Sequence, residues 1–359
     1  MGSPYMEWVK TQPPAEFPLV TSGLQFCPLS LLDTHLAAIE INGPSFYGHP
    51  PLLDAVARHC GADPDCVVLT EGTSMANHLA MACLLRSGDE VLMERPCYEL
   101  LPSLASYLGA TIRPFPRRSE DRFRIRPEDI RKAITPATRL IVLSNLHNPS
   151  SAFVDEATLA EIGDIAKDAG AKVLVDEVYL ESLRPDSVPA RSAFHLGSQF
   201  VTTNSLTKCY GLNGLRCGWA LAEPDLARRM WRLNDLFGVI PAHPAEQLGL
   251  AAFGAIDKLR RRTSEHMAVN WRAFEETLGS HPALELFHPP GGTVVFPRLR
   301  GGGVDAFGAR LLRDYGTSVV PGRFFGSPEH FRIGLGGDAA KVRAGLRRIA
   351  DAASGHTGE

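Results

Sequence analysis

The sequence predicts an α/β protein in which a mostly parallel sheet is covered by helices. Between about residues 66 and 229, short apolar runs rich in β-branched residues alternate with segments of helical period. The apolar runs are nearly continuous rather than alternating, which indicates strands that are buried on both faces. Strands that alternate with helices in this way favour parallel pairing, so the larger domain is expected to be of the α/β class.

The strand and helix segments follow one another in a regular order. Each of the first strands is followed by a helix, and these strand and helix segments are 66–70 with 74–85, 89–94 with 98–109, and 138–144 with 157–170. Further strands are then expected at 171–179, 199–205 and 215–222. The carboxyl ends of parallel strands meet at one edge of the sheet, and this edge is where we expect a ligand.

The character of the chain changes beyond about Pro241. A long helical segment runs to about Leu278, and short strand-like runs broken by glycine and proline follow it, before a final helix. This pattern is typical of a smaller α+β unit, against which the proline-rich N-terminal segment could pack. We therefore expect a large domain at 45–240 and a small domain formed by 1–44 together with 241–359.

Composition and charge argue against nucleic acid as a partner. Hydrophobic residues make up 44% of the chain and charged residues 21%, as in soluble globular proteins, and the formal net charge is -3. No run of lysine and arginine is long enough to neutralise a series of phosphates. The most basic stretch, around Arg117, contains interleaved acids and prolines and is interpreted as a solvated loop.

Membrane and metal functions are not indicated either. No apolar run approaches the roughly 20 residues that cross a membrane, and the first residues have no apolar signal core. A cytoplasmic protein without a membrane anchor is therefore expected. The seven cysteines are scattered and include no C-x-x-C pair, so the sequence indicates neither a zinc site nor a disulfide framework.

Lys208 is the first candidate for chemistry. It follows the strand expected at 199–205 and is flanked by Leu206 and Cys209. Partial desolvation there would disfavour the charged form and leave a nucleophilic amine that can form a Schiff base. Taken alone, however, a lysine is more often an ordinary exposed residue.

Asp176 directly follows the run KVLV, where a carboxylate is poorly solvated unless a cation or donor meets it. A pyridinium nitrogen would be such a partner, and a helix cap or structural salt bridge is an equally good explanation. Tyr179 and Asn148 could hydrogen-bond a phenolic oxygen, with core packing and an Asn-Pro turn as their alternatives. Tyr98 offers a flat face for ring stacking or for core packing.

A set of small and basic residues could bind a phosphate. Part of the set lies between a strand and a helix, where free backbone N–H groups and the helix dipole favour an anion. The rest flanks Lys208 and could complete the site. A simple capped turn is the alternative for the first group. The residues are Gly72, Thr73, Ser74, Ser205 and Arg216.

Together these residues resemble the site of a fold-type I pyridoxal phosphate enzyme of the class I/II aminotransferase family. The resemblance extends from SFYG at Ser45 to FRIGLGG near the C-terminus and is densest in SLTKCYGLNGLRCGW at 205–219. It implies an aspartate aminotransferase-like fold with a seven-stranded-type sheet and pyridoxal 5'-phosphate as the cofactor. The implied reaction moves an amino group between an α-amino acid and a 2-oxo acid.

By this resemblance, Lys208 is similar to the lysine that holds the cofactor as an internal aldimine and then moves a proton between substrate and cofactor. Asp176 would keep the ring nitrogen protonated, and Tyr179 and Asn148 would bond the ring hydroxyl. Tyr98 would stack on the ring. The residues similar to the family's phosphate binders are Gly72, Thr73, Ser74, Ser205 and Arg216.

The resemblance also identifies substrate and subunit contacts. Tyr47, in FYG, is similar to a tyrosine that reaches the partner's phosphate, which implies a homodimer with shared active sites. Arg332, in FRIGLGG, is similar to the arginine that binds the substrate α-carboxylate, with a surface ion pair as the alternative. Asn148 and Gly23, in TSGL, would lie beside that carboxylate. Many relatives have Asn-Pro-Thr-Gly where this chain has Asn-Pro-Ser-Ser at 148–151, so the loop can take another path.

Other interpretations fit parts of the sequence. The stretch 301–306 matches the dinucleotide pattern G-x-G-x-x-A without the required strand-helix-strand context, and is expected to be a flexible loop. The stretch 72–76 nearly matches the hydrolase pattern G-x-S-x-G but lacks its last glycine. Two alternatives remain open: another reaction of the same cofactor, such as elimination, decarboxylation or cyclisation, and a regulatory domain without catalysis.

Overall fold

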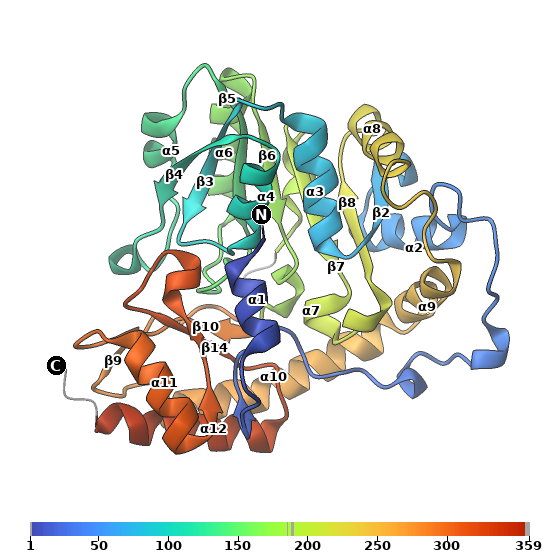
Figure 1. The fold of residues 1–359 in the computed structure, drawn as a ribbon. Helices are drawn as coiled ribbons and strands as arrows, with labels where there is room; N and C mark the ends of the chain where they lie inside the picture. The colour runs from blue at the N-terminus through green and yellow to red at the C-terminus, as the bar shows by residue number, and fades with distance from the viewer. Residues whose placement is uncertain (1, 185, 188–189, 356–359) are drawn as a thin grey trace.

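A seven-stranded sheet forms the larger part of the molecule. The computed structural model describes residues 2–184, 186–187 and 190–355, and Figure 1 shows the sheet in its upper half. The strand order is β2-β8-β7-β6-β5-β3-β4, and of these seven β8 alone runs antiparallel to its neighbours. The predicted α/β class is confirmed. The strands are β2 (Val67–Glu71), β3 (Glu90–Arg95), β4 (Thr111–Pro116), β5 (Thr138–Ser144), β6 (Lys172–Asp176), β7 (Phe200–Ser205) and β8 (Cys217–Leu221).

Helices cover both faces of this sheet because successive residues of each strand point to opposite sides. In β5, Leu140 and Val142 belong to a core shared with α3, whereas Ile141 and Leu143 belong to a second core shared with α6. This burial on two sides explains why the strand sequences are apolar without alternation. The helices of this part are α2 (Pro50–Cys60), α3 (Thr73–Leu84), α4 (Leu100–Tyr107), α5 (Pro127–Ala133), α6 (Glu156–Asp168), α7 (Thr207–Tyr210), α8 (Pro224–Asn234) and α9 (His243–Gly254).

The C-terminal part combines long helices with short strands around a core of its own, which includes Phe274, Phe331 and Leu346. The N-terminal segment joins this part through β1, which pairs in parallel with β12. The helices are α10 (Ile256–Leu278), α11 (Val304–Tyr315) and α12 (Ala339–Ser354). The strands are β1 (Phe17–Pro18), β9 (Leu284–Glu285), β10 (Val294–Val295), β11 (Arg298–Leu299), β12 (Thr317–Ser318), β13 (Val320–Pro321) and β14 (Phe331–Gly334).

A helix near the N-terminus, α1 (Pro4–Thr11), is absent from the sequence interpretation. Proline stands at its start, and the Ser3 hydroxyl accepts a hydrogen bond from the Met6 N–H at 3.1 Å, which caps the first turn. In Figure 1 this helix lies at the front, between the large sheet above and the C-terminal helices below. Its buried Tyr5 meets the ring of Tyr98 edge to face, with 5.9 Å between the ring centroids.

The interpretation of the basic stretch around Arg117 as a solvated loop is wrong. Residues 111–116 form the edge strand β4, parallel to β3, and the prolines are tolerated because one side of an edge strand has no ladder partner. Arg117 itself is 1% exposed. Its guanidinium is buried because Glu94 accepts a charged hydrogen bond from it at 2.7 Å.

Neither a membrane-spanning helix nor a metal-binding group is found in the described part of the chain. It contains no helix with the length and apolar character needed to cross a bilayer. It also contains no group of three or more histidine, cysteine or acidic side chains placed to hold a metal ion. The stretch 301–306 leads into α11, with Gly303 at its N-cap in a left-handed conformation (φ 71°).

Candidate active site

A cavity of about 200 Å³ lies where β5, β6 and β7 end. Its wall contains nine of the residues singled out from the sequence, drawn from five separate segments of the chain. They are Thr73, Ser74, Tyr98, Asn148, Asp176, Tyr179, Ser205, Lys208 and Arg216. The polar residues after these strands therefore meet at one edge of the sheet, as the parallel topology requires.

Asp176 is the last residue of β6 and is 5% exposed. One carboxylate oxygen accepts from Asn77 Nδ2 at 2.9 Å and the other from the Val178 N–H at 3.1 Å. Asn77 is held in this orientation because its own carbonyl accepts from Thr203 Oγ1 at 2.7 Å. Burial raises the pKa of Asp176, and the two donors and the Lys208 ammonium oppose that rise. A cation placed against this carboxylate would lower the pKa further.

Lys208 lies on α7, which begins directly after β7. Burial and the repulsion of Arg332 lower the pKa of its amine to about 8, although Asp176 acts in the opposite direction. Lys208 Nζ donates to Ser22 Oγ at 3.1 Å, and Tyr179 OH donates to the same oxygen at 2.8 Å. The lowered pKa gives the amine a larger neutral fraction near physiological pH than an ordinary lysine has, and the neutral form is the one that acts as a nucleophile or general base.

Gly23 and Gly72 permit close approaches at the rim of the cavity. A Cβ at Gly23 would lie 3.3 Å from Lys208 Cδ, and the adjacent Leu24 N–H donates to the Lys208 carbonyl at 2.8 Å. A Cβ at Gly72 would lie 2.5 Å from Arg216 Nη2, and its φ of 80° also favours glycine. Gly23 and Gly72 therefore allow the side chains of Lys208 and Arg216, respectively, to approach the backbone closely.

The other end of the cavity has the chemistry of an anion site. Arg216 enters it while donating to the carbonyls of Glu71 (3.0 Å) and Asn213 (3.3 Å). The hydroxyls of Thr73 and Thr207 are buried and have no hydrogen-bond partner among the described residues. A guanidinium and two free hydroxyl donors beside the start of α3 are suited to a phosphate.

Arg332, on β14, lies behind Asn148 rather than in the cavity wall. Its side chain is fully buried, so the alternative of a surface ion pair does not apply. One terminal nitrogen donates to Asn148 Oδ1 at 2.9 Å, and the other donates to Tyr5 OH at 2.8 Å and to the Val20 carbonyl at 3.1 Å. The Nε–H group has no partner among the described residues. A buried cation without an acidic partner is a strong binding site for a carboxylate.

Tyr47 lies apart from this cavity and from the residues that border it. Its ring is 43% exposed and lies edge-on to Trp231. Its hydroxyl donates weakly to Asp235 at 3.4 Å and accepts from Arg232 at 3.1 Å. Among the described residues, the contacts of the Tyr47 ring and hydroxyl are with Trp231, Asp235 and Arg232, none of which lines the cavity.

The profile of the family described as aminotransferase class I and II matches residues 40–349. The chain belongs to that family. It is 33% identical over 318 residues to a capreomycidine synthase of Streptomyces vinaceus, covering 88% of this chain and 81% of the relative. It is 31% identical over 305 residues to an arginine–pyruvate transaminase of Pseudomonas aeruginosa, covering 80% and 75%. A solved PLP-dependent aminotransferase from Streptococcus suis superposes with a TM-score of 0.91 at 23% identity, covering 97% and 96% of the two chains.

Membership of this family makes the protein a pyridoxal phosphate-dependent enzyme of fold type I, as the sequence predicts. The cavity of this aminotransferase-family chain fits the cofactor part by part. The unpartnered hydroxyls of Thr73 and Thr207 and the guanidinium of Arg216 suit the phosphate. The buried carboxylate of Asp176 suits the basic ring nitrogen, and the amine of Lys208 suits the aldehyde.

Several residues of this site are missing from the sequence interpretation. Asn77, Ser22 and Tyr5 each contact a predicted residue from a segment that is far away in sequence. Thr207 immediately precedes Lys208, and Met6 projects from the unpredicted helix α1. The spacing of Asn77 four residues after Thr73 places both on one face of α3, and this signal could have identified it.

Proposed function

We propose that this protein is an aminotransferase that moves an amino group between an α-amino acid and a 2-oxo acid. The observation that carries the proposal is the Lys208 amine, whose pKa falls to about 8 in the same cavity as Asp176 and next to the buried Arg332. Bound pyridoxal phosphate would supply an electron sink for the charge that develops at the substrate α-carbon. Lys208 Nζ would take the α-proton and return it to the cofactor side, since its pKa is close to the working pH.

Other residues of this chain would hold the reactants in place. Asp176 would keep a proton on the ring nitrogen, and Asn77 would keep Asp176 oriented. Tyr179 would bond the ring oxygen, and Tyr98 would cover the ring. A ring fixed in this way determines which bond of the substrate is aligned for cleavage.

We assign the substrate α-carboxylate to Arg332. Tyr5 and Asn148 each occupy part of its guanidinium, and the Nε–H group remains available. A bidentate carboxylate would displace or rearrange the Tyr5 contact, so α1 would respond to substrate. Simple amines without a carboxylate should be poor substrates for the same reason.

Arginine is the amino acid that we place first among substrates, with pyruvate as the acceptor. One similar relative is named an arginine–pyruvate transaminase. In this chain, Glu99 follows Tyr98 and accepts hydrogen bonds from the hydroxyls of Ser3 and Ser103. It forms no ion pair with the described residues, so its negative charge is available to attract a cationic substrate side chain.

The role of Glu99 can be tested by substrate preference. Glu99→Gln should lower kcat/KM for arginine relative to alanine by roughly tenfold, as expected for loss of a charged hydrogen bond. Glu7→Gln, on the exposed side of α1, is the matched control and should leave the ratio unchanged. An unchanged ratio in Glu99→Gln would remove Glu99 from the substrate site.

A second candidate function is another pyridoxal phosphate reaction on an amino acid, namely elimination, decarboxylation or cyclisation. The relative named capreomycidine synthase favours it, because that name denotes formation of a product rather than amino transfer. Incubation of the holoenzyme with single amino acids and 2-oxo acids separates the two. Transfer of nitrogen-15 to the oxo acid supports an aminotransferase; ammonia, carbon dioxide or an isomeric ring product without transfer supports the second candidate.

We also propose a homodimer whose active sites are shared, in which Tyr47 reaches the partner's phosphate. The described residues expose large apolar side chains that a subunit would cover, and one of them, Phe46, directly precedes Tyr47 in the chain. They are Phe26 (79% exposed), Ile41 (73%), Phe46 (74%) and Leu236 (78%). Light scattering should give twice the mass of the 39.0 kDa chain, and Tyr47→Phe should weaken cofactor binding. A monomer with full activity would refute this arrangement.

The division into a large domain at 45–240 and a small domain formed by 1–44 with 241–359 is part of the same proposal. Relative movement of the two would open and close the space between Arg332 and Lys208. Limited proteolysis with and without substrate would detect such a movement. Identical cleavage patterns would argue against it.

A further inference from the structure

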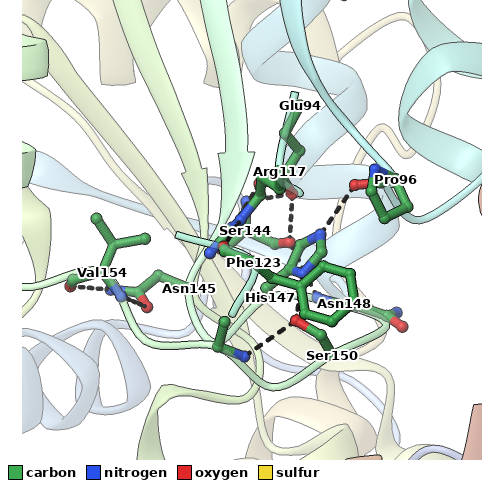
Figure 2. Close-up of polar contacts among 11 residues, drawn as sticks. Glu94, Pro96, Arg117, Phe123, Ser144, Asn145, His147, Asn148, Ser150 and Val154 are labelled. Carbon is green, nitrogen blue, oxygen red and sulfur yellow. Dashed lines mark hydrogen bonds and ion pairs between the residues drawn. The ribbon is translucent and has the colours of Figure 1, made fainter. Parts of the chain in front are cut away.

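A buried ion pair lies beside the active site without entering it. Figure 2 shows Glu94, at the end of β3, with Arg117, which directly follows β4. Neither side chain has any exposed surface, and Arg117 Nη1 donates to Glu94 at 2.7 Å. Arg117 Nε also donates to the Phe123 carbonyl at 2.7 Å. Neither residue belongs to the cavity wall.

The pair is connected to the active site through Ser144. One carboxylate oxygen of Glu94 accepts both the N–H (2.8 Å) and the hydroxyl (2.6 Å) of Ser144. The Ser144 hydroxyl has thus committed its proton and acts as the acceptor for the Asn148 N–H at 3.1 Å. Asn148 in turn accepts from Arg332 through its side-chain carbonyl. The hydrogen bonds along this path therefore all run in one direction: Asn148 donates to Ser144, and Ser144 donates to Glu94.

The two polar atoms of the Asn148 side chain would each contact a different partner. Its carbonyl oxygen is taken by Arg332, so its amide nitrogen, which has no partner among the described residues, is directed elsewhere in the cavity. In the proposed function that nitrogen donates to the ring oxygen of the cofactor. A small displacement of the Asn148 backbone would therefore disturb both the cofactor contact and the carboxylate anchor.

Stability alone does not account for the ion pair. Replacement of a buried ion pair by apolar residues is often neutral or stabilising, so the presence of such a pair is weak evidence that it stabilises the fold. The loop after β5 is also held by contacts that do not involve the pair. Asn145 exchanges two hydrogen bonds with Val154, both at 3.0 Å, and His147 bonds Ser150 (2.6 Å) and the Pro96 carbonyl (2.8 Å).

We propose that Glu94, held by Arg117, is a positioning residue that acts through Ser144 to fix Asn148 between the cofactor and the substrate carboxylate. The link is specific, because Ser144 is the single residue in the described chain that contacts both Glu94 and Asn148 by side-chain hydrogen bonds. The inference about the cofactor contact rests on the proposed function. The positioning of Asn148 against Arg332 does not.

Ser144→Ala is the sharpest test because it removes the link and leaves the ion pair and the Ser144 N–H bond in place. The KM for the amino acid should rise about tenfold while kcat changes by less than about twofold, which corresponds to loss of one or two hydrogen bonds that act on substrate binding. The visible absorption of bound pyridoxal phosphate should titrate at a higher pH than in the wild type. Ser144→Thr restores a hydroxyl and should restore both properties.

Glu90→Gln provides the matched control. Glu90 lies on the same strand at its far end, is 8% exposed, and likewise accepts from threonine hydroxyls and pairs with an arginine. This variant should lose thermal stability and keep the wild-type KM and visible titration. Glu94→Gln should lose thermal stability, as Glu90→Gln does. Unlike Glu90→Gln, it should also change KM and the visible titration in the same way as Ser144→Ala.

Two results would overturn the proposal. The first is a Ser144→Ala protein that loses only thermal stability, in the manner of Glu90→Gln. The second is a crystal structure of cofactor-free Ser144→Ala in which Asn148 Oδ1 still lies within hydrogen-bond distance of Arg332; loss of that contact supports the proposal. The crystal comparison needs no cofactor, so it decides the positioning role even if the wild type binds no pyridoxal phosphate and the proposed function fails.

Discussion

Asp176 and Glu177 are neighbours in the chain, yet their carboxylates belong to different cavities. Asp176 faces the cavity of about 200 Å³ that contains Lys208, whereas Glu177 lines a cavity of about 900 Å³ bordered by Trp219 and Trp271. The larger cavity has no buried side-chain polar atom without a hydrogen-bond partner among the described residues. The smaller one has two unpartnered hydroxyls and an amine with a lowered pKa.

In the larger cavity, the carboxylate of Glu181 is paired with neighbouring groups. Glu181 accepts from His59 at 3.0 Å and from Tyr210, and Arg260 lies 3.5 Å away. Although burial acts to raise the pKa of Glu181, these hydrogen bonds and charges hold it below its ordinary value. Size therefore does not identify the active site in this molecule; polar groups that lack partners do.

The largest expected effect is at Lys208. Lys208→Ala should lower kcat by about 10⁴-fold, because it removes the amine that we propose both attaches the cofactor and moves the proton. Circular dichroism should show an intact fold, because the lysine contributes one hydrogen bond to Ser22. Activity near that of the wild type would contradict the assignment of the smaller cavity.

The comparison of the two neighbouring acids can be made directly. Asp176→Asn should lower kcat roughly a hundredfold, because it removes the charge that stabilises a protonated ring nitrogen. Glu177→Gln, one residue away and equally buried, should keep kcat within about twofold. Steady-state kinetics on the two holoenzymes would test this, and equal losses in both variants would break the distinction between the cavities.

Cofactor attachment to the cofactor-free protein should depend on pH. The Lys208 pKa is lowered from 10.5 to about 8, so the amine is mostly protonated below pH 8 and neutral above it. The second-order rate with pyridoxal phosphate should rise about tenfold per pH unit below 8 and level off above it. Stopped-flow absorbance measures this rate. A plateau reached only near pH 10.5 would show that the amine is not desolvated.

Tyr5→Phe should have a smaller effect. It removes the hydroxyl that accepts from Arg332 and leaves the ring packed against Tyr98. KM for the amino acid should change about fivefold, in line with one hydrogen bond. The direction of the change in KM is informative. A higher KM means that Tyr5 helps to hold Arg332 for substrate, and a lower KM means that Tyr5 competes with the substrate for Arg332. No change would exclude α1 from substrate binding.

The smallest expected effect concerns stability. Burial raises the pKa of Glu177 from 4.5 to about 8, so the folded protein binds more protons than the unfolded chain between these values. Stability from this group is therefore lost as pH rises through that window. Glu177→Gln should melt a few degrees higher relative to the wild type at pH 8 than at pH 5. A constant difference would mean that Glu177 is ionised throughout.

Particular residues show what the sequence could predict. The buried strands were recognisable because both faces are covered, so that β5 is apolar at every position from Leu140 to Leu143. The edge strand β4 was missed because Pro114, Pro116 and Arg113 interrupt its apolar pattern, which an edge position tolerates. The sequence pattern does not predict helix α1, because the helix is short and its contacts form only in the folded state.

In the candidate site, too, only some of the residues can be predicted from the sequence. Residues at or just beyond the end of a buried strand, such as Asp176 and Lys208, can be identified from that position. Ser22, Tyr5 and Glu94 cannot, because each acts on a residue at least 50 positions away, and only the tertiary structure creates these contacts. Sequence patterns therefore predict the residues proposed to contact the cofactor better than the residues that hold these in place.

The most direct test of this account is reduction of the protein with borohydride in the presence of pyridoxal phosphate, followed by peptide mapping. The smaller cavity contains Lys208, and no lysine lines the larger one within the described residues. We predict a single reduced adduct, on Lys208, with loss of the yellow colour. An adduct on another lysine, or no colour at all with excess cofactor, would contradict the central claim that the smaller cavity, with its unpartnered polar groups, is the active site.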